Sequence, residues 1–408
     1  MSTTQTLARV TQTSLPYATR IVLAFLDRLK GGTLTLVGPA GFNRRFGDGA
    51  GPQMRITLND WQVLERSLKG GDIGFAETYM EGRWHSDNLA GMVELFCRNR
   101  DSLEKVIFGS LIAGGIYRLK HWLNRNTLAR AKKNIEAHYD LGNAFYKLWL
   151  DPSMTYSSAL FAGNHALDLE QAQAAKIRRI LQRLAPNPGD TILEIGCGWG
   201  GFAEIAAREF GVRVTGLTLS GEQLRYANER LAQAGVGDRV DLHLRDYRDM
   251  HGHFDHVVSI EMFEAVGEQY WDEYCACIRR NLKAGGRAIV QSISIDEALF
   301  ERYRKGTDFI QQYIFPGGML PSPTAFRARA GAAGLLVADE FRFGRDYAET
   351  LRRWRESFME ALPAVRGNGF NERFTRLWEF YLAYCEGAFN AGSTDVFQFE
   401  LIHATRSK

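Results

Sequence analysis

The fold is decided by Leu193-Glu194-Ile195-Gly196-Cys197-Gly198-Trp199-Gly200-Gly201. This stretch follows an apolar run typical of a buried strand and precedes an amphipathic pattern typical of a helix. Its glycines allow a sharp turn and let the backbone approach a ligand closely. The G-x-G-x-G spacing is tighter than the dinucleotide fingerprint, and Glu194 would repel a pyrophosphate. The stretch therefore predicts a strand, a turn and a helix around a ligand other than a dinucleotide.

Apolar strands and helical patterns alternate from about residue 185 onward. Strands are predicted at residues 190–195, 213–217, 239–244, 254–260 and 287–293, and helices at 202–210, 221–234 and 268–282. Such alternation gives an α/β fold with a mostly parallel sheet covered by helices. Two late strands, 335–343 and 396–405, are separated by a long helical insertion, which predicts an antiparallel edge strand.

The first hundred residues have a different pattern. They predict a helix at 21–29, strands at 33–37, 42–46 and 55–58, and a helical region at 61–100. This pattern is typical of a small α+β domain that precedes the parallel sheet.

The charge is distributed unevenly along the chain. The 408 residues carry 50 Lys+Arg and 47 Asp+Glu, and the average composition excludes disorder, collagen and coiled coil. Residues 1–150 hold 20 basic and 13 acidic residues, or +7, whereas residues 151–408 hold 30 and 34, or −4. Between Arg118 and Asn134 there are six basic residues and no acidic one. The basic front half indicates an anionic partner, either nucleic acid or an anionic membrane.

Cysteines and hydropathy indicate where the protein works. The five cysteines form no even framework, which favours reduced thiols in the cytoplasm. The N-terminal residues have no secretory pattern, and no apolar run approaches the ~20 residues that span a bilayer. We therefore expect a cytoplasmic protein that lies peripherally on the inner face of the cell membrane.

Eight segments, in order along the chain, resemble the cyclopropane-fatty-acyl-phospholipid synthase family, which includes the mycolic acid methyltransferases. These segments are residues 138–143, 154–158, 196–201, 216–223, 246–249, 262–264, 313–322 and 346–347. The resemblance implies a class I methyltransferase fold that uses S-adenosylmethionine. It also implies three parts: a membrane-docking N-terminal domain at 1–115, a basic linker helix at 116–135 and the methyltransferase domain at 136–408.

The resemblance implies a set of cofactor-binding residues. They are Tyr156 and Ser157 over the cofactor, Gly196, Gly198 and Gly200 beside its methionine part, Thr218, Leu219 and Gln223 at the ribose and adenosine, and Asp246 and Tyr247 at the adenine. The second strand departs from the usual pattern of the fold, because it ends without the acid that commonly binds the ribose.

The reaction implied by the resemblance is methyl transfer to a double bond of an unsaturated phospholipid acyl chain. The transfer leaves a carbocation, which aromatic faces can stabilise in an apolar pocket. Loss of a proton from the new methyl group closes a cyclopropane, and loss elsewhere leaves an alkene or an exocyclic methylene. A base must take that proton.

Family members usually bind bicarbonate as the base. The corresponding positions here are Ser158, Glu264, Gln291, Ile293 and Tyr347. Ser158 stands where the family has Cys, and Gln291 where it has His. Glu261 stands where the family commonly has Gly, and a helical turn would bring it to the same face as Glu264. Two carboxylates near one apolar pocket raise one pKa, which suits a base.

Two hypotheses for the base follow from these departures. In the first, bicarbonate binding is weakened or absent, and Glu261 or Glu264 is the base. In the second, Ser158 and Gln291 still hold bicarbonate through hydrogen bonds.

Two other functions are alternatives to lipid methylation. A small-molecule methyltransferase would need a polar acceptor site, which we do not find in the sequence, and a non-catalytic lipid-transfer protein would not need the cofactor segments. The sequence has no motif for a flipped base, so we expect no nucleic-acid partner. No metal site is predicted, and a homodimer would present two basic surfaces to one membrane.

Overall fold

The computed structural model describes residues 15–102 and 141–404. The chain divides into two compact units. The first unit comprises Met1–Arg118 and Phe370–Ala391, and the second comprises Leu119–Gly369 and Gly392–Lys408.

The second unit is built on a seven-stranded sheet with the order β10-β11-β9-β8-β5-β6-β7. The strands are β5 (Thr191–Ile195), β6 (Arg213–Thr218), β7 (Val240–Leu244), β8 (Phe254–Ile260), β9 (Leu282–Ile295), β10 (Leu335–Arg342) and β11 (Thr394–His403). The five strands from β7 to β9 are parallel, and β11 is antiparallel to both β9 and β10. The predicted mostly parallel sheet is therefore confirmed, but its antiparallel strand lies one place inside the edge.

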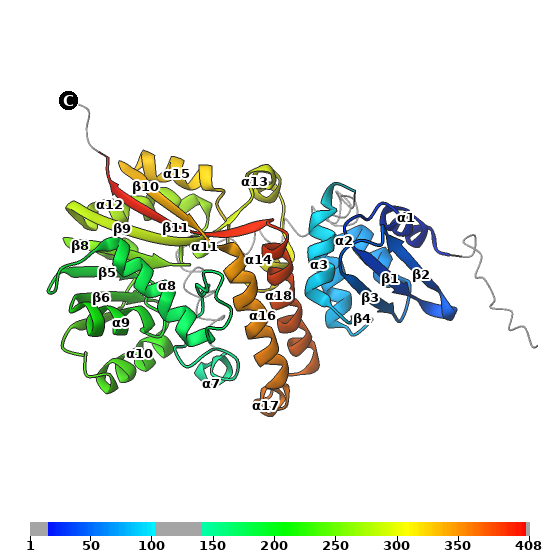
Figure 1. Ribbon diagram of the computed structural model, residues 1–408, viewed down its shortest axis with the longest axis horizontal. Coiled ribbons are helices and arrows are strands. Elements are labelled where there is room, and N and C mark those ends of the chain that lie inside the picture. The colour runs from blue at the N-terminus through cyan, green and yellow to red at the C-terminus, as the bar shows by residue number, and fades with distance from the viewer. Residues whose placement is uncertain (1–14, 103–140, 405–408) are drawn as a thin grey trace, which may run out of the picture. The chain divides into compact units, whose positions relative to one another are not determined.

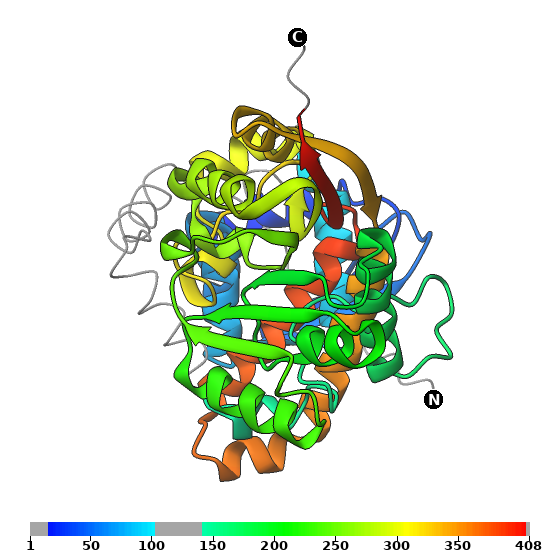
Figure 2. The same cartoon turned by 90° about the vertical axis from the view of Figure 1, so that its left-hand side faces the viewer.

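Helices cover both faces of this sheet (Figures 1 and 2). They include α8 (Leu169–Leu184) and α9 (Gly201–Phe210) on one face, and α12 (Trp271–Asn281) and α15 (Pro323–Ala332) on the other. Neighbouring residues of a strand point to opposite faces. Thus Leu193 packs in the core with α12, whereas Ile192 packs in the core with α8 and α9.

The remaining helices of the second unit connect the strands. They are α7 (Asn143–Tyr146), α10 (Gly221–Gln233), α11 (Phe263–Val266), α13 (Glu297–Lys305), α14 (Phe309–Tyr313), α16 (Gly344–Glu360) and α17 (Leu362–Gly367), with the 3-10 turns η3 (Tyr247–Asp249) and η4 (Glu268–Tyr270). The helix predicted at 268–282 consists of η4 followed by α12, and the strand predicted at 287–293 is longer than expected.

The first unit contains a four-stranded sheet with the order β2-β1-β3-β4. Its elements are α1 (Tyr17–Leu26), β1 (Thr33–Val37), η2 (Pro39–Gly41), β2 (Asn43–Gly47), β3 (Gln53–Leu58), α2 (Gln62–Met80), β4 (Trp84–Ser86) and α3 (Leu89–Arg98). The sequence predicted only helix at 61–100, so β4 was missed. The helix ends there because Gly82 turns the chain at a φ of 72° and β4 pairs with β3.

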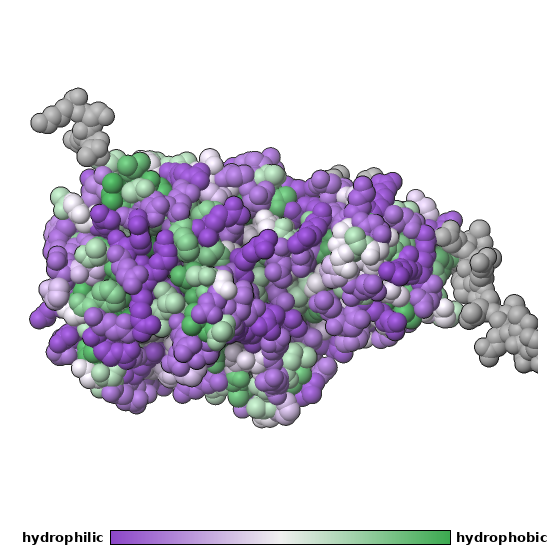
Figure 3. Space-filling view, viewed as in Figure 1, coloured by the Kyte–Doolittle hydropathy of each residue, from purple (hydrophilic) through white to green (hydrophobic). Residues whose placement is uncertain are grey.

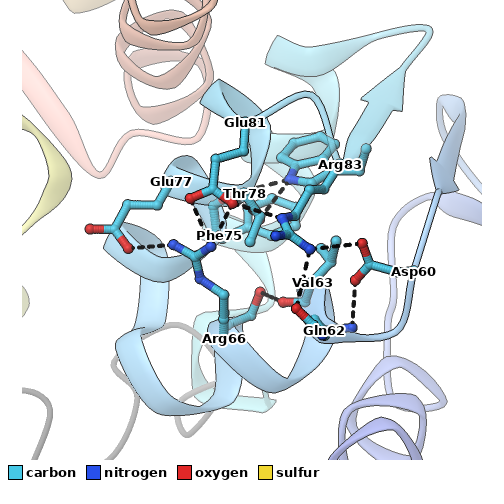
Figure 4. A network of polar contacts seen from close by, with 11 residues as sticks. Asp60, Gln62, Val63, Arg66, Phe75, Glu77, Thr78, Glu81 and Arg83 are labelled. Carbon is cyan, nitrogen blue, oxygen red and sulfur yellow. Dashed lines mark hydrogen bonds and ion pairs between the residues drawn. The ribbon is translucent and has the colours of Figure 1, made fainter. Parts of the chain in front are cut away.

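An ion-pair network closes a bend inside α2. Gly71 adopts φ 62° and ψ −140°, a conformation that glycine tolerates best. Arg66 precedes the bend, and Glu77 and Glu81 follow it. The Arg66 guanidinium contacts the Glu77 carboxylate at 2.8 Å and the Glu81 carboxylate at 2.7 Å. Arg83 also contacts Glu81 at 2.7 Å, and Figure 4 shows both guanidinium groups directed at these carboxylates. Because several charges share partners, this network stabilises the bend more than one isolated surface pair would.

The helix α18 (Glu372–Asn390) corrects the predicted domain division, because residues 370–391 belong to the first unit. Its Phe380 packs against the rings of Phe75 and Trp84. A Cβ at Gly387 would lie 2.7 Å from the Ala90 carbonyl oxygen, so only glycine permits this close contact with α3. The predicted boundaries at 115 and 136, and the linker helix between them, lie outside the described residues.

No helix within residues 15–102 and 141–404 has the length and apolar character needed to cross a bilayer. On the face drawn in Figure 3, hydrophobic residues lie in small groups among hydrophilic ones.

Candidate active site

The predicted glycine loop connects β5 to α9. Gly196, Gly198 and Gly200 have φ values of 88°, 50° and 84°, in the left-handed region that favours glycine. The backbone amides of Gly196 and Cys197 both donate to the Leu217 carbonyl on β6, at 3.0 and 2.8 Å. This arrangement fixes the loop at the carboxyl end of the parallel strands, where ligands bind in open α/β sheets.

The residues predicted at the ribose and adenine follow β6 and β7. The Thr218 hydroxyl donates to Gln223 Oε1 at 2.9 Å, and Leu219, which directly follows β6 in the chain, is half-buried. The Asp246 carboxylate accepts a hydrogen bond from Arg248 Nε at 2.8 Å. Burial opposes ionisation of Asp246, but the hydrogen bonds from Arg248 outweigh it and lower the pKa of Asp246. Tyr247 is buried, and its hydroxyl has no hydrogen-bond partner among the described residues. Because β5, β6 and β7 are parallel neighbours, these residues follow the same edge of the sheet as the glycine loop.

Glu194 makes this region suitable for a cationic ligand. It is the second-last residue of β5, two positions before Gly196, and its Oε2 is buried without a hydrogen-bond partner in the described part of the chain. Burial raises the pKa of Glu194 to about 8. A cation bound beside the loop would stabilise the ionised form. The residues present therefore fit S-adenosylmethionine, which carries a sulfonium and an ammonium group.

The predicted covering residues lie on the segment that follows α7. Ser157 is buried, and its hydroxyl accepts from Lys176 Nζ at 2.5 Å. Tyr156 is half-buried, and its ring lies 5.5 Å from Trp149 and 5.4 Å from Trp354. The aromatic residues Phe145, Tyr146, Trp149 and Phe161 are at most 1% exposed, so they form core rather than an open surface.

Glu261 lies at the centre of the predicted catalytic residues. Its Oε1 accepts from the Ser158 backbone amide at 2.8 Å and from Gln291 Nε2 at 2.7 Å. Its Oε2 accepts from the Tyr347 hydroxyl at 2.6 Å. The side chain of Ser158 is directed elsewhere, because its hydroxyl donates to the Ala159 carbonyl. Three of the five positions implied as bicarbonate ligands therefore donate to one carboxylate of the chain itself.

Glu264 has a different environment. Its Oε1 accepts from the Ile293 backbone amide, and its Oε2 is buried without a hydrogen-bond partner among the described residues. Burial raises the pKa of Glu264 to about 8, and the Glu261 carboxylate adds to the effect. Burial also raises the pKa of Glu261, although Lys176, Tyr347, Ser158 and Gln291 oppose that rise.

The expected helical turn joining the two glutamates is wrong. The helix α11 begins at Phe263, and Glu261 precedes it at a left-handed φ of 51°. A left-handed residue cannot belong to a right-handed helix. The two carboxylates nevertheless interact electrostatically, and the predicted upward shift of a carboxyl pKa is confirmed.

Comparison with known proteins shows the family of the chain. Residues 126–399 match the family described as mycolic acid cyclopropane synthetase. The chain is 38% identical over 387 residues to the tuberculostearic acid methyltransferase UfaA1 of Mycobacterium tuberculosis, covering 90% of this chain and 87% of the relative. The chain belongs to this family. It is therefore an S-adenosylmethionine-dependent methyltransferase.

Two further members of the family extend the comparison. The cyclopropane-fatty-acyl-phospholipid synthase of Escherichia coli is 37% identical over 353 residues, covering 84% of this chain and 86% of the relative. The crystal structure of mycolic acid cyclopropane synthase CmaA1, complexed with SAH and CTAB, is 32% identical with a TM-score of 0.62. It covers 66% of this chain and 97% of the solved chain.

Two polar groups of the site were not predicted from the sequence. Lys176 is 0% exposed on α8 and faces Glu261, Asp151 and Glu194. Gln398 on β11 is 2% exposed and donates to Gln291 Oε1 at 3.0 Å. Each had a signal in the sequence: Lys176 lies at helical spacing from the buried Ala172 and Ile180, and Gln398 interrupts an apolar strand.

Proposed function

We propose that the enzyme methylates a double bond in an unsaturated acyl chain of a membrane phospholipid, with Glu261 as the base. One observation supports this most strongly: Glu261 accepts hydrogen bonds from Ser158, Gln291 and Tyr347. At these positions the family resemblance implies bicarbonate ligands. The Glu261 carboxylate is itself a trigonal group of oxygen acceptors, as bicarbonate is, so it takes the role of that ion.

The two glutamates have different protonation states in this proposal. Burial raises the pKa of Glu261, but three donors and the nearby Lys176 cation oppose this rise and favour the ionised form. Glu264 has one amide donor, and its pKa of about 8 keeps it mostly neutral at pH 7. Neighbouring groups whose environments separate their pKa values commonly divide acid and base roles. We therefore assign the base to Glu261, and a neutral Glu264 avoids a second buried negative charge.

The residues of this chain then act after methyl transfer. S-adenosylmethionine supplies an electrophilic methyl group, whose transfer to the double bond leaves a carbocation on the acyl chain. Protons next to a carbocation are strongly acidic, so a carboxylate that holds three hydrogen bonds is still basic enough to remove one. Glu261 takes that proton, and the electron pair of the broken C–H bond forms the product.

The product depends on which proton leaves. Removal from the new methyl group, with its electron pair attacking the cation, closes a cyclopropane. If a hydride first shifts to the cationic carbon, removal from the same methyl group leaves an exocyclic methylene. This product therefore does not need the loss of a proton elsewhere on the chain, which was expected from the sequence. Either product is neutral and needs no oxidant or reductant. One relative is named a tuberculostearic acid methyltransferase and another a cyclopropane-fatty-acyl-phospholipid synthase, so both a branched and a cyclopropane product are kept in this proposal.

The test of this function is a product analysis. The enzyme is incubated with methyl-labelled S-adenosylmethionine and vesicles of an oleoyl phospholipid, and the lipids are read by mass spectrometry and NMR. We expect label in the acyl chain as a cyclopropane or a methylene branch. Label only in the headgroup, or in no lipid, would contradict the proposal.

Membrane docking is proposed for the basic stretch of the front half. Of the net +7 in residues 1–150, residues 103–140 contribute seven basic and three acidic residues, or +4. This stretch lies outside the described residues, so its role rests on sequence alone. Each basic residue near an anionic bilayer contributes about 1 kcal/mol. We propose peripheral binding to the inner face of the membrane, with a homodimer as the bound form.

Neutralising Arg118, Lys120, Arg125 and Lys133 with Gln is expected to weaken binding to anionic liposomes by roughly 100-fold or more. The affinity for S-adenosylmethionine should not change. Co-sedimentation with liposomes that contain an anionic phospholipid checks the first point, and calorimetry checks the second. Unchanged sedimentation of the variant would refute docking by this stretch.

A further inference from the structure

A continuous hydrogen-bond chain leads from Arg179 on α8 to Glu261. The Arg179 guanidinium donates to Gln398 Oε1, Gln398 Nε2 donates to Gln291 Oε1 at 3.0 Å, and Gln291 Nε2 donates to Glu261 Oε1 at 2.7 Å. Gln291 and Gln398 are 0% and 2% exposed, so water does not compete with these bonds. The guanidinium also lies 3.7 Å over the ring of Phe341, which limits its movement.

The direction of every bond in this chain follows from its first residue. A guanidinium has only donors, so the Gln398 atom that faces Arg179 must be the oxygen. The Gln398 amide nitrogen then faces Gln291, which must present its own oxygen. The Gln291 nitrogen is left to face Glu261. Rotating either amide by 180° would set two acceptors or two donors against each other.

We propose that Arg179 and Gln398 are positioning residues, which hold the Gln291 amide in the orientation that donates to Glu261 and so keep that carboxylate ionised until it takes the proton. This inference rests on the proposed function, because it assumes that Glu261 is the base. Neither residue touches substrate in this proposal, and both act through Gln291.

The same geometry assigns the incoming proton to one oxygen of Glu261. Oε1 faces the Ser158 amide and the Gln291 amide, and both of these can only donate to it. Oε2 faces the Tyr347 hydroxyl, which can donate or accept. The proton therefore binds Oε2, and the Tyr347 hydroxyl rotates to accept from it. In the described part of the chain, the charged groups on other elements that interact with Glu261 are Lys176 on α8 and Glu264 on α11.

Two variants and a matched control test the proposal. Arg179→Met and Gln398→Leu each leave the Gln291 amide free to rotate, so the proton affinity of Glu261 should rise about tenfold. Arg183→Met is the control, because Arg183 lies one turn later on α8 and donates to Glu400 on β11 at 2.7 Å, whereas Arg179 donates to Gln398. Gln398→Glu replaces the amide that donates to Gln291 with a carboxylate that can only accept. It should therefore raise the proton affinity of Glu261 further than Gln398→Leu does.

The measurement is kcat/KM against pH, with the affinity for S-adenosylmethionine measured by calorimetry as a check of folding. We expect the acidic limb to move to higher pH in the two variants, about tenfold lower rates below that limb, and wild-type rates at high pH. Arg183→Met should keep the wild-type profile. Rates that fall equally at every pH, or an unmoved limb, would overturn the proposal.

The outcome also separates this proposal from the proposed function. If wild-type enzyme makes the labelled lipid and Glu261→Gln does not, the base is supported. An unmoved limb in Arg179→Met and Gln398→Leu would then exclude only the positioning role. If Glu261→Gln keeps wild-type activity, the base assignment itself fails.

Discussion

Glu261→Gln is expected to lower kcat by a factor of roughly 10² to 10⁴, the range over which general bases contribute. Glutamine has the same shape, and its amide can still accept from Ser158 and Gln291 and donate to Tyr347. The site should therefore keep its structure while losing the group that removes the proton. Calorimetry should give an affinity for S-adenosylmethionine close to that of the wild type, and single-turnover product formation measures the loss.

Glu264→Gln is the matched control for this prediction. Because the pKa of Glu264 is about 8, most of this carboxyl is already neutral at pH 7. Its amide replacement should therefore cost much less activity at that pH than Glu261→Gln does. If Glu264→Gln is the more damaging variant, the two roles are reversed.

Lys176→Met is expected to lower activity at pH 7 by a factor of roughly 10 to 100 and to restore much of it at higher pH. Among the described residues, Lys176 is the cation that favours ionisation of Glu261. Burial lowers the pKa of this lysine to about 8 against the attraction of Glu261, Asp151 and Glu194. Without the cation, the proton affinity of Glu261 rises, by about 10-fold or more for a close charge. A base that is protonated at neutral pH recovers when the pH is raised.

The matched control is Lys147→Met. Lys147 is exposed on the surface next to α7, and its ammonium lies over the Tyr226 ring rather than beside the carboxylates. This variant loses the same charge from the second unit but should keep the pH profile of kcat/KM. A Lys176→Met profile that coincides with that of the wild type would show that the cation does not control Glu261.

The sequence predicted the catalytic fold well because its strands and turns are specified locally. The run from Leu193 to Gly201 requires a turn with three left-handed positions, and the glycines supply them. Alternating apolar residues of each strand then fill two separate cores. In contrast, α18 is joined to the first unit by packing that only the fold reveals. Its own pattern, an amphipathic helix after α17, would also suit the second unit.

The sequence predicted which residues form the candidate site, but it did not predict how they are arranged. Resemblance to the family gave Ser158, Glu264, Gln291, Ile293 and Tyr347, and the presence of Glu261 as an added acid. It did not give the left-handed backbone of Glu261, which turns its carboxylate toward Ser158, Gln291 and Tyr347. Such a conformation is uncommon for glutamate and is not readable from composition or spacing.

The polar groups behind the site were not predicted because they are distant in sequence. Gln398 lies 107 residues from Gln291, and Arg179 lies 219 residues from Gln398. Pairing of β11 with β9 places Gln398 opposite Gln291 in register. Long-range pairing of this kind follows from sheet topology, which the local pattern of one sequence does not specify.

The central claim, that the base belongs to the chain, is tested most directly by the dependence of the rate on bicarbonate. Product formation is measured in buffer stripped of carbon dioxide and again after bicarbonate is added. A family member with Gly, Cys and His at the positions of Glu261, Ser158 and Gln291 serves as the comparison. We predict that the rate of this enzyme is the same in both buffers. A rate that collapses without bicarbonate and returns on its addition would contradict the assignment of Glu261 as the base.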